Sequence, residues 1–185
     1  MVIMEIQKKI ISLEDEQREI QRRIAMKYLG FLREGTPSFD YLIMLLQSGV
    51  QNQEYTLKDI GTTKEELKDF WVNGCKKIAL EELSLLREGT SDYDIILRNL
   101  RRQAQQADFA LEEIGTSEQE LEELRIRCAR SLAHRYLELL RLEIPEPEFY
   151  FKFLNLGVEN GDFTLGDIGT TEEELEELRH ISECV

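Results

Sequence analysis

The segment at residues 60–67 reads IGTTKEEL, and it returns as IGTSEQEL at 114–121 and as IGTTEEEL at 168–175. Both intervals are 54 residues, since 114 − 60 and 168 − 114 are equal. The match extends upstream, where an aromatic residue stands five positions before each isoleucine, at Tyr55, Phe109 and Phe163. Self-similarity at a fixed period is typical of repeat proteins, in which neighbouring copies shelter each other's apolar faces. The sequence therefore predicts three tandem copies of one element of about 54 residues.

Each copy carries two helix-start signals on either side of a shared glycine. Thr56 and Asp59 fit a capping box for one helical turn, which Gly61 would end in the left-handed backbone region. Thr63 and Glu66 then fit a second capping box that opens a longer helix. A cap one residue earlier, at Thr62, also fits, so the sequence leaves this register open.

The spacing of apolar residues predicts the helices. Steps of three, four and seven predict long helices over 63–87 and 117–141, and the first has its stripe at Leu67, Phe70, Gly74, Ile78 and Leu85. Shorter helices are expected to start near 36–37, 90–91 and 145–147, with the second one running further than the others. Gly49 and Gly157 are expected to cap the C-terminal ends of the first and third short helices.

These elements define an all-α fold. A long helix over 4–33 would cover the open face of the first copy, as the end of a stack of repeats requires. The predicted organisation is an N-terminal capping helix at 1–35, copies at 36–89 and 90–143, and a third copy at 144–185 with a truncated last helix. An α-solenoid and a compact bundle both fit this pattern.

Composition narrows the class of protein. The chain has 185 residues, 42% of them hydrophobic, and no run of 18 apolar residues or basic leader before an apolar stretch. We therefore expect no membrane contact and a cytoplasmic location. The three cysteines are widely spaced, which indicates reduced thiols, with Cys75 and Cys128 buried in helices and Cys184 exposed near the end.

The negative charge is concentrated in the last copy. The whole chain carries a net charge of −14, and residues 145–185 alone hold 2 Lys/Arg against 11 Asp/Glu, a balance of −9. Such a field repels nucleic-acid phosphates and anionic membranes and attracts a basic partner. Glu172, Glu173 and Glu174 are the candidate partner-binding acids in this stretch.

The motifs give no support for catalysis, a cofactor or a metal. The Glu177–His180 spacing matches half of a di-iron carboxylate motif, but the other histidine, His134, has no matching glutamate three residues before it. The sequence contains no glycine-rich phosphate loop and no calcium-binding loop. We therefore expect a protein that is not an enzyme.

Trp71 is the only tryptophan, and its equivalents in the later copies are Arg125 and Arg179. A position that is arginine twice is expected at the surface or lining a groove, which makes Trp71 a candidate anchor for a protein partner. The alternative is that Trp71 covers the contact with the N-terminal helix.

A second candidate surface is a basic cluster. It is predicted either to pair internally with glutamates or to dock an acidic surface, and its members are Arg98, Arg101, Arg102, Arg125, Arg127 and Arg130. Because the last helix is short, association of two molecules through the third copy is a further expectation.

The predicted function is a non-enzymatic interaction scaffold or adaptor, whose acidic C-terminal copy favours a basic partner. The alternative is a DNA-binding regulator that uses the corner at 57–67 as a helix-turn-helix. Two features weigh against this alternative. The first helix of the corner is too short, and the acids at the start of the second would face phosphates, so nucleic acid is an unlikely partner.

Overall fold

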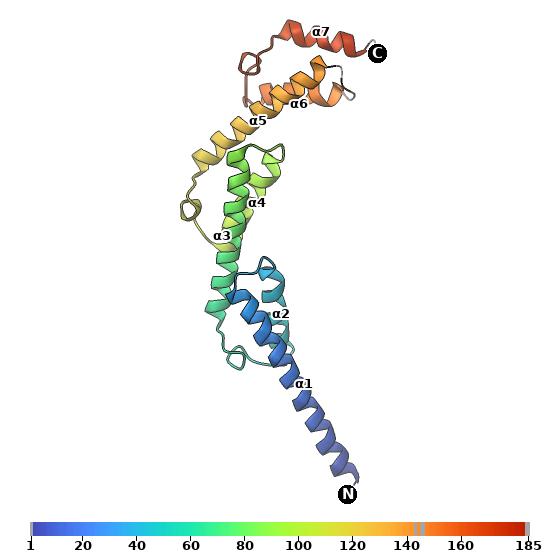
Figure 1. Ribbon diagram of the computed structural model, residues 1–185, viewed down its shortest axis with the longest axis vertical. Helices are drawn as coiled ribbons and strands as arrows, with labels where there is room; N and C mark the ends of the chain where they lie inside the picture. The colour runs from blue at the N-terminus through green and yellow to red at the C-terminus, as the bar shows by residue number, and fades with distance from the viewer. Residues whose placement is uncertain (1, 143, 145–146, 184–185) are drawn as a thin grey trace. The chain divides into compact units, whose positions relative to one another are not determined.

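The computed structural model describes residues 2–142, 144 and 147–183, with every side chain among them except those of residues 2, 3, 8 and 183. The described residues form helices and turns without any strand, so the chain is all-α (Figure 1). Their order is α1 (Val2–Arg33), α2 (Phe39–Gln51), α3 (Lys64–Glu88), α4 (Tyr93–Ala107), η1 (Leu111–Ile114), α5 (Glu118–Arg141), α6 (Pro147–Glu159), η2 (Gly166–Ile168) and α7 (Glu172–Glu183).

The chain divides into two compact units. Unit 1 comprises the residues up to Ile78 together with Ala107–Phe109, and unit 2 comprises Ala79–Gln106 and the chain from Ala110 onward. In unit 1 the core includes Leu29, Leu46 and Ile60, and in unit 2 it includes Leu100, Leu121 and Leu154. The organisation into a solenoid or a closed bundle, and the boundaries of the three copies, stay predictions.

The predicted helices agree with the observed ones to within a few residues. The expected spans 4–33, 63–87 and 117–141 correspond to α1, α3 and α5. The second short helix is longer, since α4 has 15 residues and α2 and α6 have 13 each. A start of the third short helix at Pro145 lies outside the described residues, and α6 is described from Pro147.

One arginine contact recurs in all three copies. The last arginine of a long helix donates to the carbonyl of the shared glycine and to a glutamate in the first turn of the next long helix. The glycine lies 28 residues after the arginine and the glutamate 33 residues after it. The carbonyl distances are 3.0, 3.0 and 3.1 Å for Arg33–Gly61, Arg87–Gly115 and Arg141–Gly169. The ion-pair distances are 3.0, 2.8 and 2.8 Å for Arg33–Glu66, Arg87–Glu120 and Arg141–Glu174. We call this contact the corner clamp.

The shared glycines have one backbone conformation. Their φ angles are 74°, 73° and 73° at Gly61, Gly115 and Gly169, in the left-handed region where a side chain is strained. This conformation turns the chain sharply after the short turn, with the glycine carbonyl accepting from the arginine. The three corners are therefore locally alike.

The second capping box of each copy is confirmed for its hydroxyl and wrong for its glutamate. The hydroxyls of Thr63, Ser117 and Thr171 accept from the backbone N–H three residues on, which settles the register. The glutamate of this second box, however, does not accept a hydrogen bond from the backbone N–H of the cap residue. Glu66 and Glu174 instead accept from the buried hydroxyls of Thr62 and Thr170 and from the clamp arginine, which is the stronger donor because it is charged.

Two further sequence predictions are wrong. Gly49 and Gly157 lie inside helices, where the rings of Tyr55 and Phe163 occupy the space that a Cβ would need. These glycines allow close packing and do not end the helix. Leu85 was placed on the inward stripe, but it is 49% exposed. The predicted stripe assumes that α3 packs along one face over its whole length. Helix α3 is instead divided between the two units after Ile78, so its buried face need not be the same in both parts.

Helix α1 buries only its last part. Ala25, Leu29 and Leu32 are buried, and α1 packs against α2. Large apolar side chains between Met4 and Ile20 of α1 are exposed, among them Ile10 and Leu13.

We expect Arg87→Ala to lower the free energy of unfolding at pH 7 by about 1 kcal/mol, since it removes a half-exposed ion pair and a bond to Gly115. The hydrogen bond from Arg87 lowers the pKa of Glu120 below its ordinary value of 4.5. The clamp's contribution is therefore complete above pH 4.5 and is lost as the pH falls through the lower folded-state pKa.

The measurement is urea unfolding of the wild type and of Arg87→Ala at pH 7 and at pH 3. The difference between the two proteins should shrink at pH 3. A difference of the same size at both pH values would contradict the clamp. Exposed Arg98 provides the control substitution Arg98→Ala.

Candidate functional site

Unit 1 contains a groove between α2 and the start of α3, with a volume of about 810 Å³. Its lining is mostly apolar. Ile43 and Leu67 are buried, and Met44 is 55% exposed. The remaining apolar lining residues are Val50, Leu57 and Trp71. Charges of both signs and two amides complete the lining, at Asp40, Lys64, Lys68, Gln47 and Gln51. A groove of this kind fits the apolar face of a helix.

Trp71 is half-buried in this groove and is held by an aromatic contact. Its ring meets Phe39 of α2 edge to face, with 5.6 Å between ring centroids. Phe39 can lie this close to α3 because Gly74 has no side chain, and a Cβ at Gly74 would overlap the Phe39 ring. The contact fixes the tryptophan at low entropic cost while leaving part of it accessible.

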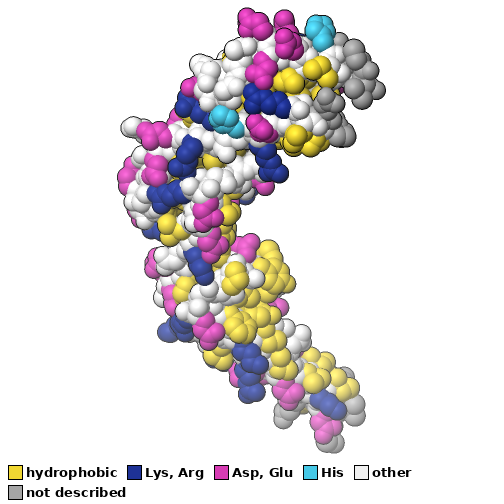
Figure 2. All heavy atoms as spheres, turned by 45° about the horizontal axis from the view of Figure 1, so that its top comes forward, with side chains coloured by type: hydrophobic (Ala, Val, Ile, Leu, Met, Phe, Trp, Pro, Cys, Tyr) yellow, Lys and Arg dark blue, Asp and Glu magenta, His cyan; other side chains and the backbone are white. Residues whose placement is uncertain are grey.

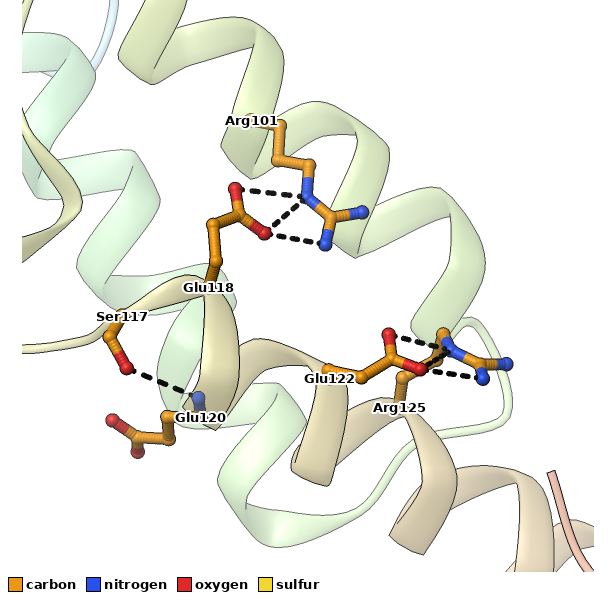
Figure 3. A network of polar contacts seen from close by, with 6 residues as sticks. All are labelled: Arg101, Ser117, Glu118, Glu120, Glu122 and Arg125. Carbon is orange, nitrogen blue, oxygen red and sulfur yellow. Dashed lines mark hydrogen bonds and ion pairs between the residues drawn. The ribbon is translucent and has the colours of Figure 1, made fainter.

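The equivalent positions in the second copy carry ion pairs. Gln47 and Lys64 line the groove, and 54 residues later they are replaced by Arg101 and Glu118. Arg101 of α4 reaches Glu118 of α5 at 2.7 Å, as Figure 3 shows. Lys68 and Trp71 are likewise replaced by Glu122 and Arg125, which pair at 2.8 Å. Ion pairs thus stand in the second copy at positions that line the groove in the first copy.

Arg125 also meets a buried carboxylate. Its guanidinium lies 2.6 Å from Asp162, and the two side chains are 24% and 8% exposed. Tyr93, the equivalent of Phe39, is buried beside this pair, and its burial raises its pKa to about 12. Arg125 is therefore engaged by carboxylates within unit 2, and its role in partner binding stays a prediction.

A second groove lies between α6 and α7 in unit 2, with a volume of about 560 Å³. Six of its lining positions are the equivalents of first-groove positions two copies earlier. The pairs are Asp40 and Glu148, Ile43 and Phe151, Met44 and Lys152, Gln47 and Asn155, Gln51 and Glu159, and Trp71 and Arg179. Arg179 stacks over Phe151 at 5.2 Å from the ring centroid. This groove has a more charged lining than the first.

The candidate acids have different roles. Glu172 and Glu173 are exposed in the first turn of α7. Glu174 is engaged in the corner clamp with Arg141, and the hydrogen bonds from Thr170 and Arg141 lower its pKa. Glu176 and Glu177 are also exposed, so the acidic surface is made of Glu172, Glu173, Glu176 and Glu177.

Most of the basic cluster pairs within the chain. Arg101 and Arg125 form the ion pairs described above, and Arg127 donates to the carbonyl of Arg87 at 2.7 Å. Arg130 lies 3.5 Å from Asp167. These contacts favour internal pairing over a docking patch.

The residues weighed for other chemistry are dispersed. His134 and His180 are exposed. Cys75 and Cys128 are buried free thiols, while Cys184 lies outside the described residues. In the described part of the chain, no three His, Cys, Asp or Glu side chains gather as they would around a metal ion. None of the described helices combines the length and the apolar character needed to cross a bilayer.

The sequence predicts a groove position at 71, 125 and 179 but does not reveal which copies have a groove. The signal that could have shown it is the exchange of Gln47 and Lys64 for the ion-pairing residues Arg101 and Glu118. Trp71 lies in unit 1, while Arg125, Arg179 and the candidate acids lie in unit 2.

No protein-family model, no curated protein and no solved structure matches this chain.

We expect Arg125→Ala to lower the free energy of unfolding by about 2 kcal/mol, because Asp162 would stay buried without its cation. Arg98→Ala, an exposed arginine in the same unit, should change it by less than about 0.5 kcal/mol. Urea unfolding followed by circular dichroism gives both values.

Adding Asp162→Asn to Arg125→Ala should recover part of the loss, since the amide carries no charge. Equal effects of the two alanine substitutions would show that the Arg125–Asp162 pair does not stabilise unit 2.

Proposed function

We propose that this chain is a non-enzymatic interaction scaffold that binds the apolar face of a helical segment from a partner protein in the groove of unit 1. The supporting observation is the groove itself, with Trp71 and Met44 accessible above buried Ile43 and Leu67. Aromatic and methionine side chains in concave apolar surfaces carry much of the energy of helix recognition.

The comparison of copies supports a binding role for the open grooves. In the second copy, Arg101 and Glu118 satisfy each other across the same place. In the first copy, Gln47 and Lys64 line an open groove. The same local positions therefore carry a charged pair in the second copy and line an apolar groove in the first, and exposed apolar surface of this kind favours a partner.

The first experiment transfers the second copy's charged pair into the first copy. The double substitution Gln47→Arg with Lys64→Glu places the second copy's ion pair across the groove. Helical peptides selected from a displayed library on the wild-type protein should bind this variant at least about tenfold more weakly. Trp71, the only tryptophan, reports the binding by fluorescence.

The reciprocal variant, Arg101→Gln with Glu118→Lys, is the matched control and should keep the affinity of the wild type. Selected peptides that bind all three proteins equally well would show that the groove is not the docking site.

The acidic surface of Glu172, Glu173, Glu176 and Glu177 supports a second, basic partner. These side chains are exposed on one helix, and residues 145–185 carry a balance of −9. Long-range attraction of this kind raises association rates and weakens with salt.

We expect an arginine-rich peptide to bind the wild type more tightly at 20 mM than at 300 mM salt. Glu172→Lys with Glu173→Lys should remove most of this salt dependence, while Asp69→Lys with Glu81→Lys, at two exposed acids of α3, should leave it. The pair at 172 and 173 is chosen because Glu174 serves the corner clamp. An unchanged salt dependence in the first variant, measured by titration calorimetry, would exclude the acidic surface.

A further inference from the structure

Helix α1 carries an exposed apolar seam with the spacing of a coiled coil. Ile6, Ile10, Leu13, Ile20 and Ile24 follow one another at steps of three, four and seven, and Gln17 occupies the one polar position between Leu13 and Ile20. These apolar side chains are 53%, 50%, 58%, 57% and 36% exposed. Figure 2 shows hydrophobic side chains at the lower end of the view, where α1 begins.

This seam is separate from the face that α1 uses inside unit 1. Ala25, Leu29 and Leu32 are the buried residues of α1. Successive helical residues are about 100° apart, which places the centre of this buried face roughly 110° from the centre of the seam. Packing of α1 on α2 therefore leaves the seam uncovered.

We propose that the seam docks against the same seam of a second molecule of this chain, as a parallel two-stranded coiled coil. Apolar residues in a heptad pattern pack in this way, each one entering a gap between four residues of the facing helix. In the parallel arrangement Gln17 meets Gln17 of the other molecule. The two amides can bond to each other, and a single polar core position of this kind fixes the register.

The charges beside the seam decide the direction of the two helices. In parallel register, Lys9 of each molecule flanks Glu14 of the other, so opposite charges meet twice. In the antiparallel arrangement that overlaps the same stretch, Lys9 would face Arg23 and each Glu14 would face the other Glu14. Like charges at these positions are destabilising, and they oppose the antiparallel form.

The polar side of α1 does not favour a membrane as the occupant of the seam. Helices that lie on membranes carry mainly Lys and Arg on the polar face. Residues 5–24 contain five acidic and five basic residues, with Glu14, Asp15 and Glu16 adjacent in the sequence. This dimer contact lies in unit 1 and differs from the contact through the third copy that the sequence suggests.

The first test measures the mass of the full chain in solution by sedimentation equilibrium. At tens of micromolar the wild type should have twice the chain mass of 21.7 kDa. Leu13→Lys should weaken association by about a hundredfold or more, because two leucines per dimer lose their burial. Ser12→Lys, which adds the same charge one residue away and off the seam, should remain a dimer.

The second test fixes the direction. Under mild oxidation Gln17→Cys should form a disulfide-linked dimer, because residue 17 lies opposite itself only in the parallel register. Asp15→Cys, on the outer side of the helix, should not form this dimer. The wild type is the control for disulfides formed by Cys75, Cys128 and Cys184. Circular dichroism confirms that each variant is folded.

Three results would overturn the proposal. One is a wild type that is monomeric at 100 µM. A monomer that binds lipid vesicles through α1 counts as the same result. Another is a dimer that Leu13→Lys leaves intact, which would place the contact elsewhere. The third is a dimer in which Gln17→Cys does not cross-link, which would exclude the parallel register.

Discussion

The folded corners depend on one guanidinium group in each copy that holds two partners at once. Arg33, Arg87 and Arg141 each end a long helix and donate both to a glycine carbonyl and to a glutamate of the next long helix. The glycine that accepts this bond has a left-handed conformation in all three copies, which a side chain would strain. The planar, forked donor set of arginine suits this double role, which the single ammonium of lysine fills less well.

The equivalent positions 71, 125 and 179 on the long helices have a different role in each copy. Trp71 rests on Phe39 and lines an apolar groove, Arg125 neutralises the buried Asp162, and Arg179 stacks on Phe151 beside a more charged groove. The backbone near these positions is set by the helix start, which the clamp and the capping hydroxyl fix. The side chain at position 71, 125 or 179 is therefore free to differ, and the three copies have an apolar groove, a set of ion pairs and a more charged groove at these positions.

Much of the helical fold was predictable because the caps and apolar spacings are local signals. Thr63, Ser117 and Thr171 mark helix starts through bonds to amides only three residues away. The clamp was not predicted, because it joins residues 33 apart and nothing in a local pattern marks Arg87 as the partner of Glu120. Gly49 was misjudged for a similar reason, since its role is set by the ring of Tyr55 and not by its own turn. The candidate positions 71 and 179 line grooves, but the ion pair of the second copy joins Arg101 and Glu118, which only the fold brings together.

The fixed separation of clamp arginine, glycine and glutamate also limits how such a chain can change in length. Helix α4 is two residues longer than α2 and α6, yet the 28-residue step to the glycine is unchanged, so the loops around it are correspondingly shorter. An inserted residue must be offset by a deletion within the same segment, or the guanidinium misses its carbonyl. Point substitutions at exposed sites meet no such restriction, and drift in sequence at constant length is the form of divergence that this architecture permits.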